Sequence, residues 1–183
     1  MAYIYTPNRP YFITQKTFSE TQYFKTDEDK QLILNEIIKF SHTDKFHISA
    51  FAILSNHLHL LGECAEPNGF QTMLKQINGA ASRNFNLKHG TTHTIWTADG
   101  RYNRALYGEH AFFKVMAYII GNPLKHGLVK SLNELANYPF CSYNEAVKEY
   151  NKPMIENLIL ETLKLDFETS AAWDRIWASI DQK

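Results

Sequence analysis

The stretch FHISAFAILSNHLHLLGE, at residues 46–63, decides the fold of this chain. Residues 46–54 and 57–63 are both rich in apolar residues that form β-structure, which favours extended strands. Ser55 and Asn56, which lie between them, are residues typical of turns. The two segments are therefore predicted to form a β-hairpin.

The segments on either side of this hairpin predict further elements in a regular order. Alternating residues at 10–17 indicate a strand, and apolar residues at helical spacing indicate helices at 27–42 and 69–88. A short edge strand at 101–106 is expected after a turn at Asp99-Gly100, followed by a helix at 109–121 that Gly121 and Pro123 would end. The order β-α-β-β-α-β predicts an α+β, ferredoxin-like fold, in which helices cover one face of an antiparallel sheet.

The last part of the chain gives a weaker pattern. Residues up to Ser142 are rich in turn formers, and two short helices are expected at about 153–165 and 168–180. We therefore expect a main domain over residues 1–145 and a helical tail over residues 146–183 that can pack on the same domain.

Composition limits the class of protein. The chain has 183 residues, of which 44% are hydrophobic and 21% are charged, as in a globular protein. No apolar run reaches the ~20 residues that span a membrane, and the N-terminus lacks the pattern of a signal peptide. Cys64 and Cys141 fit neither a zinc pattern nor a disulfide framework. We therefore expect a cytoplasmic protein without a membrane partner.

The net charge of zero hides an uneven distribution. Residues 1–130 contain 14 basic and 10 acidic residues, whereas residues 131–183 contain 5 and 9. A mildly basic body with an acidic tail can still present a basic face to nucleic acid, although the same asymmetry also arises as ordinary variation.

His57 and His59 are the most informative pair of residues. On a strand, residues i and i+2 face the same side, so both imidazoles would project together while Leu58 turns into the core. Two neutral imidazoles on one rigid strand provide half of a site for a divalent metal. The same spacing also occurs by chance in pairs of exposed histidines without a role, and the triplet alone leaves both readings open.

The flanks of the pair carry a family resemblance. LSNHLHLL at residues 54–61 resembles the histidine–hydrophobic–histidine signature of the HUH endonucleases, in particular the single-tyrosine transposases. This family includes the IS200-like transposases and the REP-associated tyrosine transposases. Its usual pattern is Pro-Asn-His-x-His-Leu-Leu, and Ser55 stands at the position where proline is common.

A second motif belongs to the same resemblance. AYIIGNPLKHGLV at residues 117–129 is similar to the family segment Tyr-Ile-x-x-Asn-Pro-Val/Leu-x-x-Gly-Leu-Val. The resemblance implies that Tyr118 is the nucleophile and that Asn122 is a third metal ligand beside His57 and His59. Helical geometry agrees, because residues i and i+4 lie on one face, and we expect Tyr118 and Asn122 to point at the sheet edge that carries the histidines. Before Pro123, Asn122 is expected where helical geometry is ending.

Further stretches extend the resemblance over about residues 9–145. They are the opening strand at 11–17, the helix at 74–86, the tryptophan and arginine segment at 95–104, and YPFCSY at 138–143. The last ~35 residues resemble nothing that we can name.

The resemblance implies an enzyme that cuts and rejoins single-stranded DNA at sites associated with hairpins. Tyr118 would form a 5′-phosphotyrosine with the help of Mg²⁺ or Mn²⁺, and the partners would be hairpin-forming DNA repeats and a second copy in a homodimer. The residues expected to contact DNA are Lys75, Arg83, Arg101, Tyr102, Arg104 and Lys125.

Three alternatives remain open from the sequence. The chain could keep the fold as a DNA-hairpin-binding protein without catalysis. It could be a metal-dependent hydrolase that uses Glu63 with the histidines, in which case Tyr118 would be dispensable. It could also be a β-α-β-β-α-β RNA-binding module, although the aromatic sheet surface that such modules use is not evident.

Overall fold

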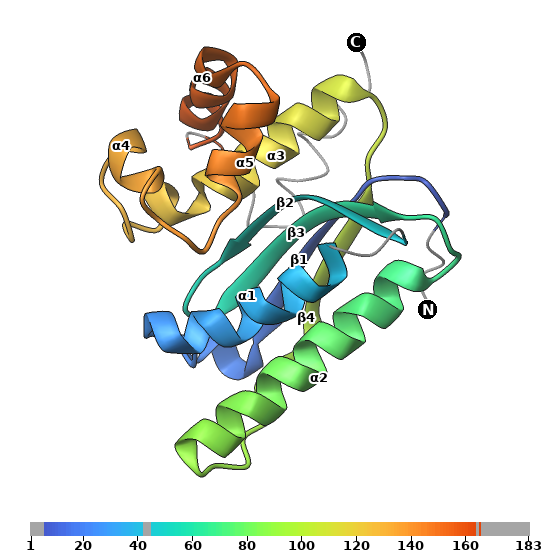
Figure 1. Cartoon of the computed structure of the whole chain (residues 1–183), viewed down its shortest axis with the longest axis vertical. Coiled ribbons are helices and arrows are strands. Elements are labelled where there is room, and N and C mark those ends of the chain that lie inside the picture. Colours follow the sequence, from blue (N-terminus) through green and yellow to red (C-terminus); the bar gives the residue numbers. More distant parts are fainter. Residues whose placement is uncertain (1–5, 42–44, 164, 166–183) are drawn as a thin grey trace.

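The computed structural model of the chain describes residues 6–41, 45–163 and 165, with the side chains of residues 98–102 left out of the description. Figure 1 shows a sheet with helices on both sides. The elements in chain order are β1 (Tyr11–Thr17), η1 (Phe18–Glu20), α1 (Asp27–Ser41), β2 (Phe46–Ile53), β3 (His57–Cys64), α2 (Gly69–His89), β4 (Trp96–Ala105), α3 (Glu109–Lys125), α4 (Leu132–Leu135), α5 (Tyr143–Glu149) and α6 (Lys152–Thr162).

The sheet has the predicted ferredoxin-like topology. Its four strands lie in the order β2-β3-β1-β4, and every neighbouring pair is antiparallel. The predicted hairpin is formed by β2 and β3, and β4 is an edge strand as expected. Because β3 lies inside the sheet, His57 and His59 lie on an interior strand rather than at the expected sheet edge.

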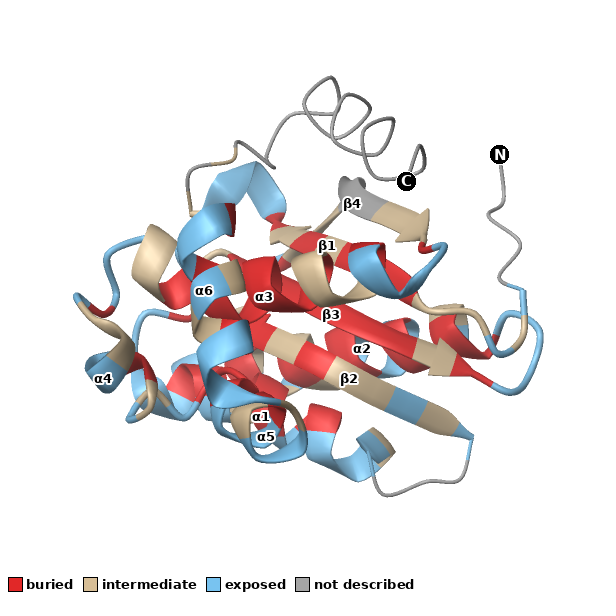
Figure 2. Cartoon of the chain, turned by 90° about the horizontal axis from the view of Figure 1, so that it is seen from above, coloured by how far each residue is buried: buried red, intermediate tan, exposed pale blue. Residues whose placement is uncertain are grey.

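Alternation along the strands divides the core into two layers. Leu58 and Leu60 of β3 pack with α1 and α2 on one face, whereas Leu61 packs with α3, α5 and α6 on the other. The α1 and α2 helices of the β-α-β-β-α-β unit thus share one face, as predicted, and α3 covers the opposite face. Figure 2 shows that burial is concentrated along β1, β3 and α3.

Two predicted boundaries are wrong. The helix expected at 109–121 continues to Lys125 with Pro123 inside it, so Asn122 is fully helical. Tertiary packing overrides the helix-breaking residues here, because this part of α3 packs against the rest of the protein and buries both Asn122 and Pro123. The turn expected at Asp99-Gly100 instead lies within β4, which begins at Trp96.

The C-terminal part contains more helix than predicted. The short helices α4 and α5 were missed, while α6 corresponds to the helix expected at 153–165 and packs on α3. The helix expected at 168–180 lies outside the described residues. The division at residue 145 stays a prediction. Within the described ranges, no helix is long and apolar enough to cross a lipid bilayer.

Candidate active site

Two elements bring the predicted site residues together. The side chains of His57 and His59 project from β3 toward α3, and their ring centroids are 4.8 Å apart. From α3, Tyr118 places its ring centroid 5.5 Å from that of His59. Asn122, one helical turn further on, is completely buried. The structure therefore assembles all four residues from a single chain.

Hydrogen bonds fix the orientation of both imidazoles. His57 Nδ1 lies 2.8 Å from Asn56 Oδ1, and because this oxygen can only accept, Nδ1 carries the proton. His59 Nδ1 lies 2.8 Å from the hydroxyl of Thr14 on β1. Both rings thus bond through Nδ1, an arrangement that leaves Nε2 for a further ligand.

Two buried polar atoms at this place have no partner. His59 Nε2 and Asn122 Oδ1 form no hydrogen bond with any described residue. The amide of Asn122 donates from Nδ2 to the carbonyl of Tyr118 at 2.8 Å, which turns its oxygen away from the helix backbone. Unsatisfied buried polar atoms are rare in proteins and often mark a bound ion or a reactive site.

Both histidines are held in the neutral form. Burial, together with repulsion from the nearby His126 and Lys16, lowers the pKa of His57 to about 3, although the side-chain amide of Asn122 favours the protonated form. Burial, together with the repulsion that a protonated His57 would exert, likewise holds the pKa of His59 well below its usual range. Neutral imidazoles are the form that binds metals.

The donor set fits a divalent metal. His57, His59 and Asn122 would supply two imidazole nitrogens and one amide oxygen, a mixed set that suits Mn²⁺ and related ions. In the described part of the chain, no group of three His, Cys, Asp or Glu residues could hold a metal ion. Asn122 Oδ1, a buried oxygen without a hydrogen bond to any described residue, is the candidate third ligand.

Cationic side chains surround the site. Lys125 Nζ lies 5.2 Å from the centroid of the Tyr118 ring, and the ring centroid of His126 lies 5.1 Å from that of His57. Lys16 pairs with His57 across β1 and β3, and its Nζ bonds Glu20 at 2.7 Å. Sequence reasoning missed Thr14, Asn56 and Lys16, because their roles depend on strand register and turn geometry that residue patterns do not reveal.

The other residues expected to contact DNA lie on two further elements, α2 and β4. Lys75 and Arg83 are on α2, which covers the face of the sheet opposite the histidines. On β4, Arg104 pairs with Phe12, Tyr102 with Thr14 and Arg101 with Gln15; the side chains of Arg101 and Tyr102 lie outside the described part. Because Phe12 packs against His59 and Tyr118, its strand partner Arg104 lies on the same face of the sheet as the histidines, and Lys125 lies beside the Tyr118 ring.

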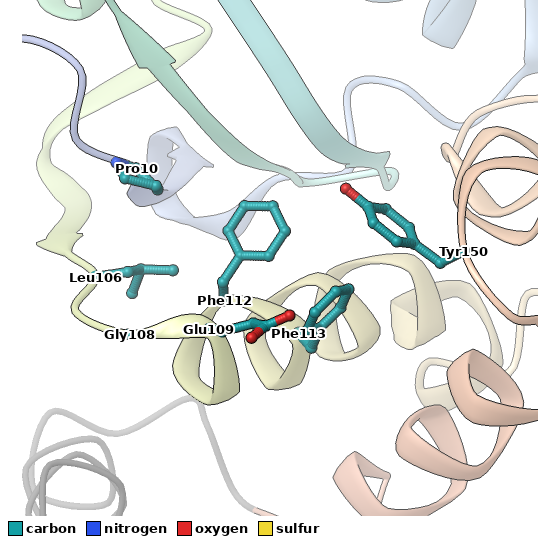
Figure 3. A pocket seen from close by; sticks show the side chains of 7 residues that line it. All are labelled: Pro10, Leu106, Gly108, Glu109, Phe112, Phe113 and Tyr150. Atoms are coloured by element: carbon teal, nitrogen blue, oxygen red, sulfur yellow. The ribbon is translucent and has the colours of Figure 1, made fainter.

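A separate hollow of about 400 Å³ lies at the start of α3 (Figure 3). It is mainly apolar and is lined by Pro10, Leu106, Phe112, Phe113 and Tyr150, with Gly108 and Glu109. None of the residues that converge near Tyr118 lines it. The candidate site is therefore the cluster between β3 and α3 and not this hollow.

Comparison with known proteins decides the family. The family model described as "Transposase IS200 like" matches residues 11–122, which includes both histidines, Tyr118 and Asn122. The chain belongs to the IS200-like transposase family. It is similar to the REP-associated tyrosine transposase of Escherichia coli, with 27% identity over 118 residues, which cover 64% of this chain and 66% of that relative. The match thus spans just under two thirds of the relative's own length.

The fold is also that of a transposase of known structure. A REP-associated tyrosine transposase bound to a REP hairpin superimposes with a TM-score of 0.62 at 23% identity, covering 81% of this chain and 84% of that one. At this identity the similarity concerns the fold alone. It agrees with the antiparallel sheet and the C-terminal helices of this IS200-like transposase.

Proposed function

We propose that this chain is a metal-dependent endonuclease and strand transferase that acts on single-stranded DNA beside hairpins. The observation that carries the proposal is the convergence of the unpartnered His59 Nε2 and Asn122 Oδ1 next to Tyr118. Membership of the IS200-like family and similarity to a transposase solved with a REP hairpin support the reaction class and the kind of DNA.

In this proposal Tyr118 is the nucleophile. Its phenolic oxygen attacks the scissile phosphorus in line, a bond from Tyr118 to phosphorus forms, and the bond from phosphorus to the 3′-oxygen breaks. The phenolic proton passes to water, and the departing 3′-oxygen takes a proton from water to become a hydroxyl. The product is a 5′-phosphotyrosine, which a later 3′-hydroxyl can attack to reseal the strand.

The other residues would hold the phosphate in place. His57, His59 and Asn122 would bind Mg²⁺ or Mn²⁺, which when bound supplies Lewis-acid stabilisation of the charge on the phosphate oxygens. The positive charge of Lys125 beside the Tyr118 ring would attract the phosphate, as would that of the nearby Lys16.

The geometry supports a site formed within one chain. Tyr118 and His59 of the same molecule are in ring contact, so the two halves of the site do not need a second copy to meet. A homodimer and the use of hairpin repeats as substrates remain proposals for this chain.

Covalent trapping tests the proposal. The protein is incubated with end-labelled hairpin DNA that has single-stranded flanks, with Mg²⁺ or Mn²⁺, and a denaturing gel reveals any adduct. We expect an adduct with the unaltered protein and none with Tyr118→Phe. The matched control is Tyr143→Phe, which removes the hydroxyl of another buried tyrosine, bonded to Glu156, in the same core layer. An adduct that survives Tyr118→Phe would contradict the assignment.

The structure weighs against two of the alternatives. Glu63 lies four residues beyond His59 along β3, roughly 13 Å away, so it does not belong to the cluster. An RNA-binding sheet needs an open face for base stacking, but helices cover both faces here. A binding protein without catalysis is the remaining alternative, and DNA binding without any adduct would favour it.

A further inference from the structure

The helix α2 has an unusual charge pattern. Over its 21 residues, Gly69–His89, it contains no aspartate or glutamate but carries Lys75, Arg83, Lys88 and His89. At the C-terminal end of α2, Lys88 and His89 both contact the carboxylate of Asp29, which lies in the first turn of α1. Lys75 and Arg83 are exposed and form no hydrogen bond or ion pair with any described residue. Two positive charges on α2 therefore face solvent without a partner in this part of the chain.

These two cations line a groove between α1 and α2. The groove has a volume of about 510 Å³, and Lys39 of α1 also lines it. Its only carboxylate, Glu36, is buried and already paired with Lys39. The groove therefore carries a net positive charge.

A glycine lies on the groove between the two cations. Lys75, Gly79 and Arg83 follow one another at intervals of four residues, so they form one stripe along α2 that extends over about 12 Å. A Cβ atom at Gly79 would meet no atom within 4 Å, so no described neighbour requires a glycine inside this helix. The missing side chain leaves the helix backbone open to close approach by a ligand.

The groove lies on the side of the molecule away from Tyr118. In Figure 1, α1 and α2 lie together over one face of the sheet, and α3 lies on the other. A phosphate held at His57 and His59 is thus separated from Lys75 and Arg83 by the sheet and a helix layer. The groove must contact a different part of any bound nucleic acid.

We infer that the α1–α2 groove binds the sugar–phosphate backbone of a double-stranded segment, with Lys75 and Arg83 as the phosphate contacts. The inference deepens the proposed function and rests on it, because the duplex would be the hairpin stem attached to the single strand at Tyr118. A duplex suits the groove better than a single strand, since unpaired bases require aromatic rings for stacking. Phe40 is the only ring that lines the groove, and it packs edge-on against Phe46 at 5.5 Å.

Equilibrium binding with EDTA present tests the inference without requiring cleavage. Fluorescence anisotropy compares two labelled DNA probes, a hairpin with a single-stranded flank and the flank alone. The variant is Lys75→Gln/Arg83→Gln, and its matched control is Lys148→Gln/Lys152→Gln, which removes two exposed lysines from α5 and α6.

For the groove variant we expect Kd for the hairpin to rise at least tenfold, with Kd for the flank unchanged. Removing two phosphate contacts should also reduce the slope of log K against log salt by about 1.8, at roughly 0.9 for each contact on duplex DNA. The control should change the hairpin Kd less than threefold.

The inference is overturned if the groove variant changes hairpin binding no more than the control does. It is also overturned if both probes weaken equally, or if the unaltered protein binds the hairpin no tighter than the flank. The trapping assay with Tyr118→Phe reports on the proposed function separately. An adduct with unaltered hairpin affinity in the groove variant would reject only the groove, whereas stem-dependent binding without any adduct would reject only the nuclease.

Discussion

At the scale of single residues, the orientation of the imidazole pair depends on a hydrogen bond between His59 and Thr14 of the neighbouring strand. The i, i+2 spacing of His57 and His59 predicted that they share one side of a strand, and their rings are in contact. Thr14 reaches His59 only because β1 and β3 pair in the register that places these two residues opposite one another. Register depends on the packing of whole strands, so no local pattern could have identified Thr14.

Thr14→Val is therefore expected to weaken binding of Mn²⁺ about 10-fold or more, because His59 loses the hydroxyl that orients its ring. Thr14→Ser, which keeps the hydroxyl, should bind Mn²⁺ nearly as well as the unaltered protein. Calorimetric titration of each protein with Mn²⁺ provides the measurement. Equal affinities of the valine and serine variants would show that the hydrogen bond does not orient a ligand.

At the scale of elements, the helices that pack on the sheet were predicted well, and the ends of α1 and α2 agree within a residue, but the end of α3 was predicted wrongly. Gly121 and Pro123 predicted a helix end, yet α3 continues to Lys125. The reason is long-range: the side chain of Ile159 on α6 lies against the bare Cα of Gly121, and the segment is buried by this contact. Asn122 consequently stays one full turn from Tyr118, as the candidate site requires.

Replacing either Gly121 or Gly79 with alanine tests this role of Gly121. In Gly121→Ala the new Cβ would lie 2.9 Å from Ile159 Cγ2, so α6 must shift, and the free energy of unfolding should fall by about 1–3 kcal/mol. Gly79→Ala meets open space and should raise it by up to about 1 kcal/mol. Urea denaturation measures both. A Gly121→Ala variant as stable as Gly79→Ala would mean that α3 and α6 are not closely packed.

The contact between α1 and α2 predicts a dependence on pH. Burial of Asp29 opposes its ionisation, but hydrogen bonds from Lys88 at 2.7 Å and His89 at 2.8 Å outweigh burial and lower its pKa. Its contribution to stability is therefore complete above the ordinary value of 3.8 and is lost as the pH falls through the lowered value in the folded protein.

Asp29→Asn should accordingly reduce the free energy of unfolding by about 1–3 kcal/mol at pH 7, and this difference should shrink below pH 4. Asp27→Asn, at an exposed carboxylate that faces Lys30 at 3.4 Å, is the control and should change stability by less than about 1 kcal/mol. Denaturation curves between pH 3 and 7 provide the test. If Asp29→Asn remains as much less stable than the unaltered protein at pH 3 as at pH 7, the contribution of Asp29 to stability does not depend on its negative charge.

At the scale of the whole molecule, the two faces of the sheet have different tasks in our proposals. The α3 face contains the candidate metal ligands and Tyr118, and the α1–α2 face carries the basic groove. Periodicity predicted the order of strands and helices and thereby the fold. It could not show that Lys75 and Arg83 lie opposite Tyr118, because that depends on which face each helix covers.

Buried polar atoms without hydrogen-bond partners should lower the free energy of unfolding of the whole protein when no metal is bound. Each buried polar atom without a partner costs about 1–3 kcal/mol, and Asn122 Oδ1 and Asn78 Oδ1 are two such atoms on different helices. Replacing either residue with leucine, which has a similar shape, removes the cost. Each variant is therefore expected to melt about 2–4 °C or more above the unaltered protein in EDTA.

Mn²⁺ should then separate the two variants. At a concentration 100 times Kd, a ligand that binds only the folded state stabilises it by about 2.7 kcal/mol, which raises the Tm of the unaltered protein and of Asn78→Leu alike. Asn122→Leu lacks the proposed oxygen ligand, so its Tm should respond little to the same Mn²⁺ concentration. Thermal melts of the three proteins with EDTA and with Mn²⁺ measure both effects. An equal Mn²⁺ response in Asn122→Leu would remove Asn122 from the metal site, whereas a lower Tm in EDTA would show that its amide stabilises the metal-free fold.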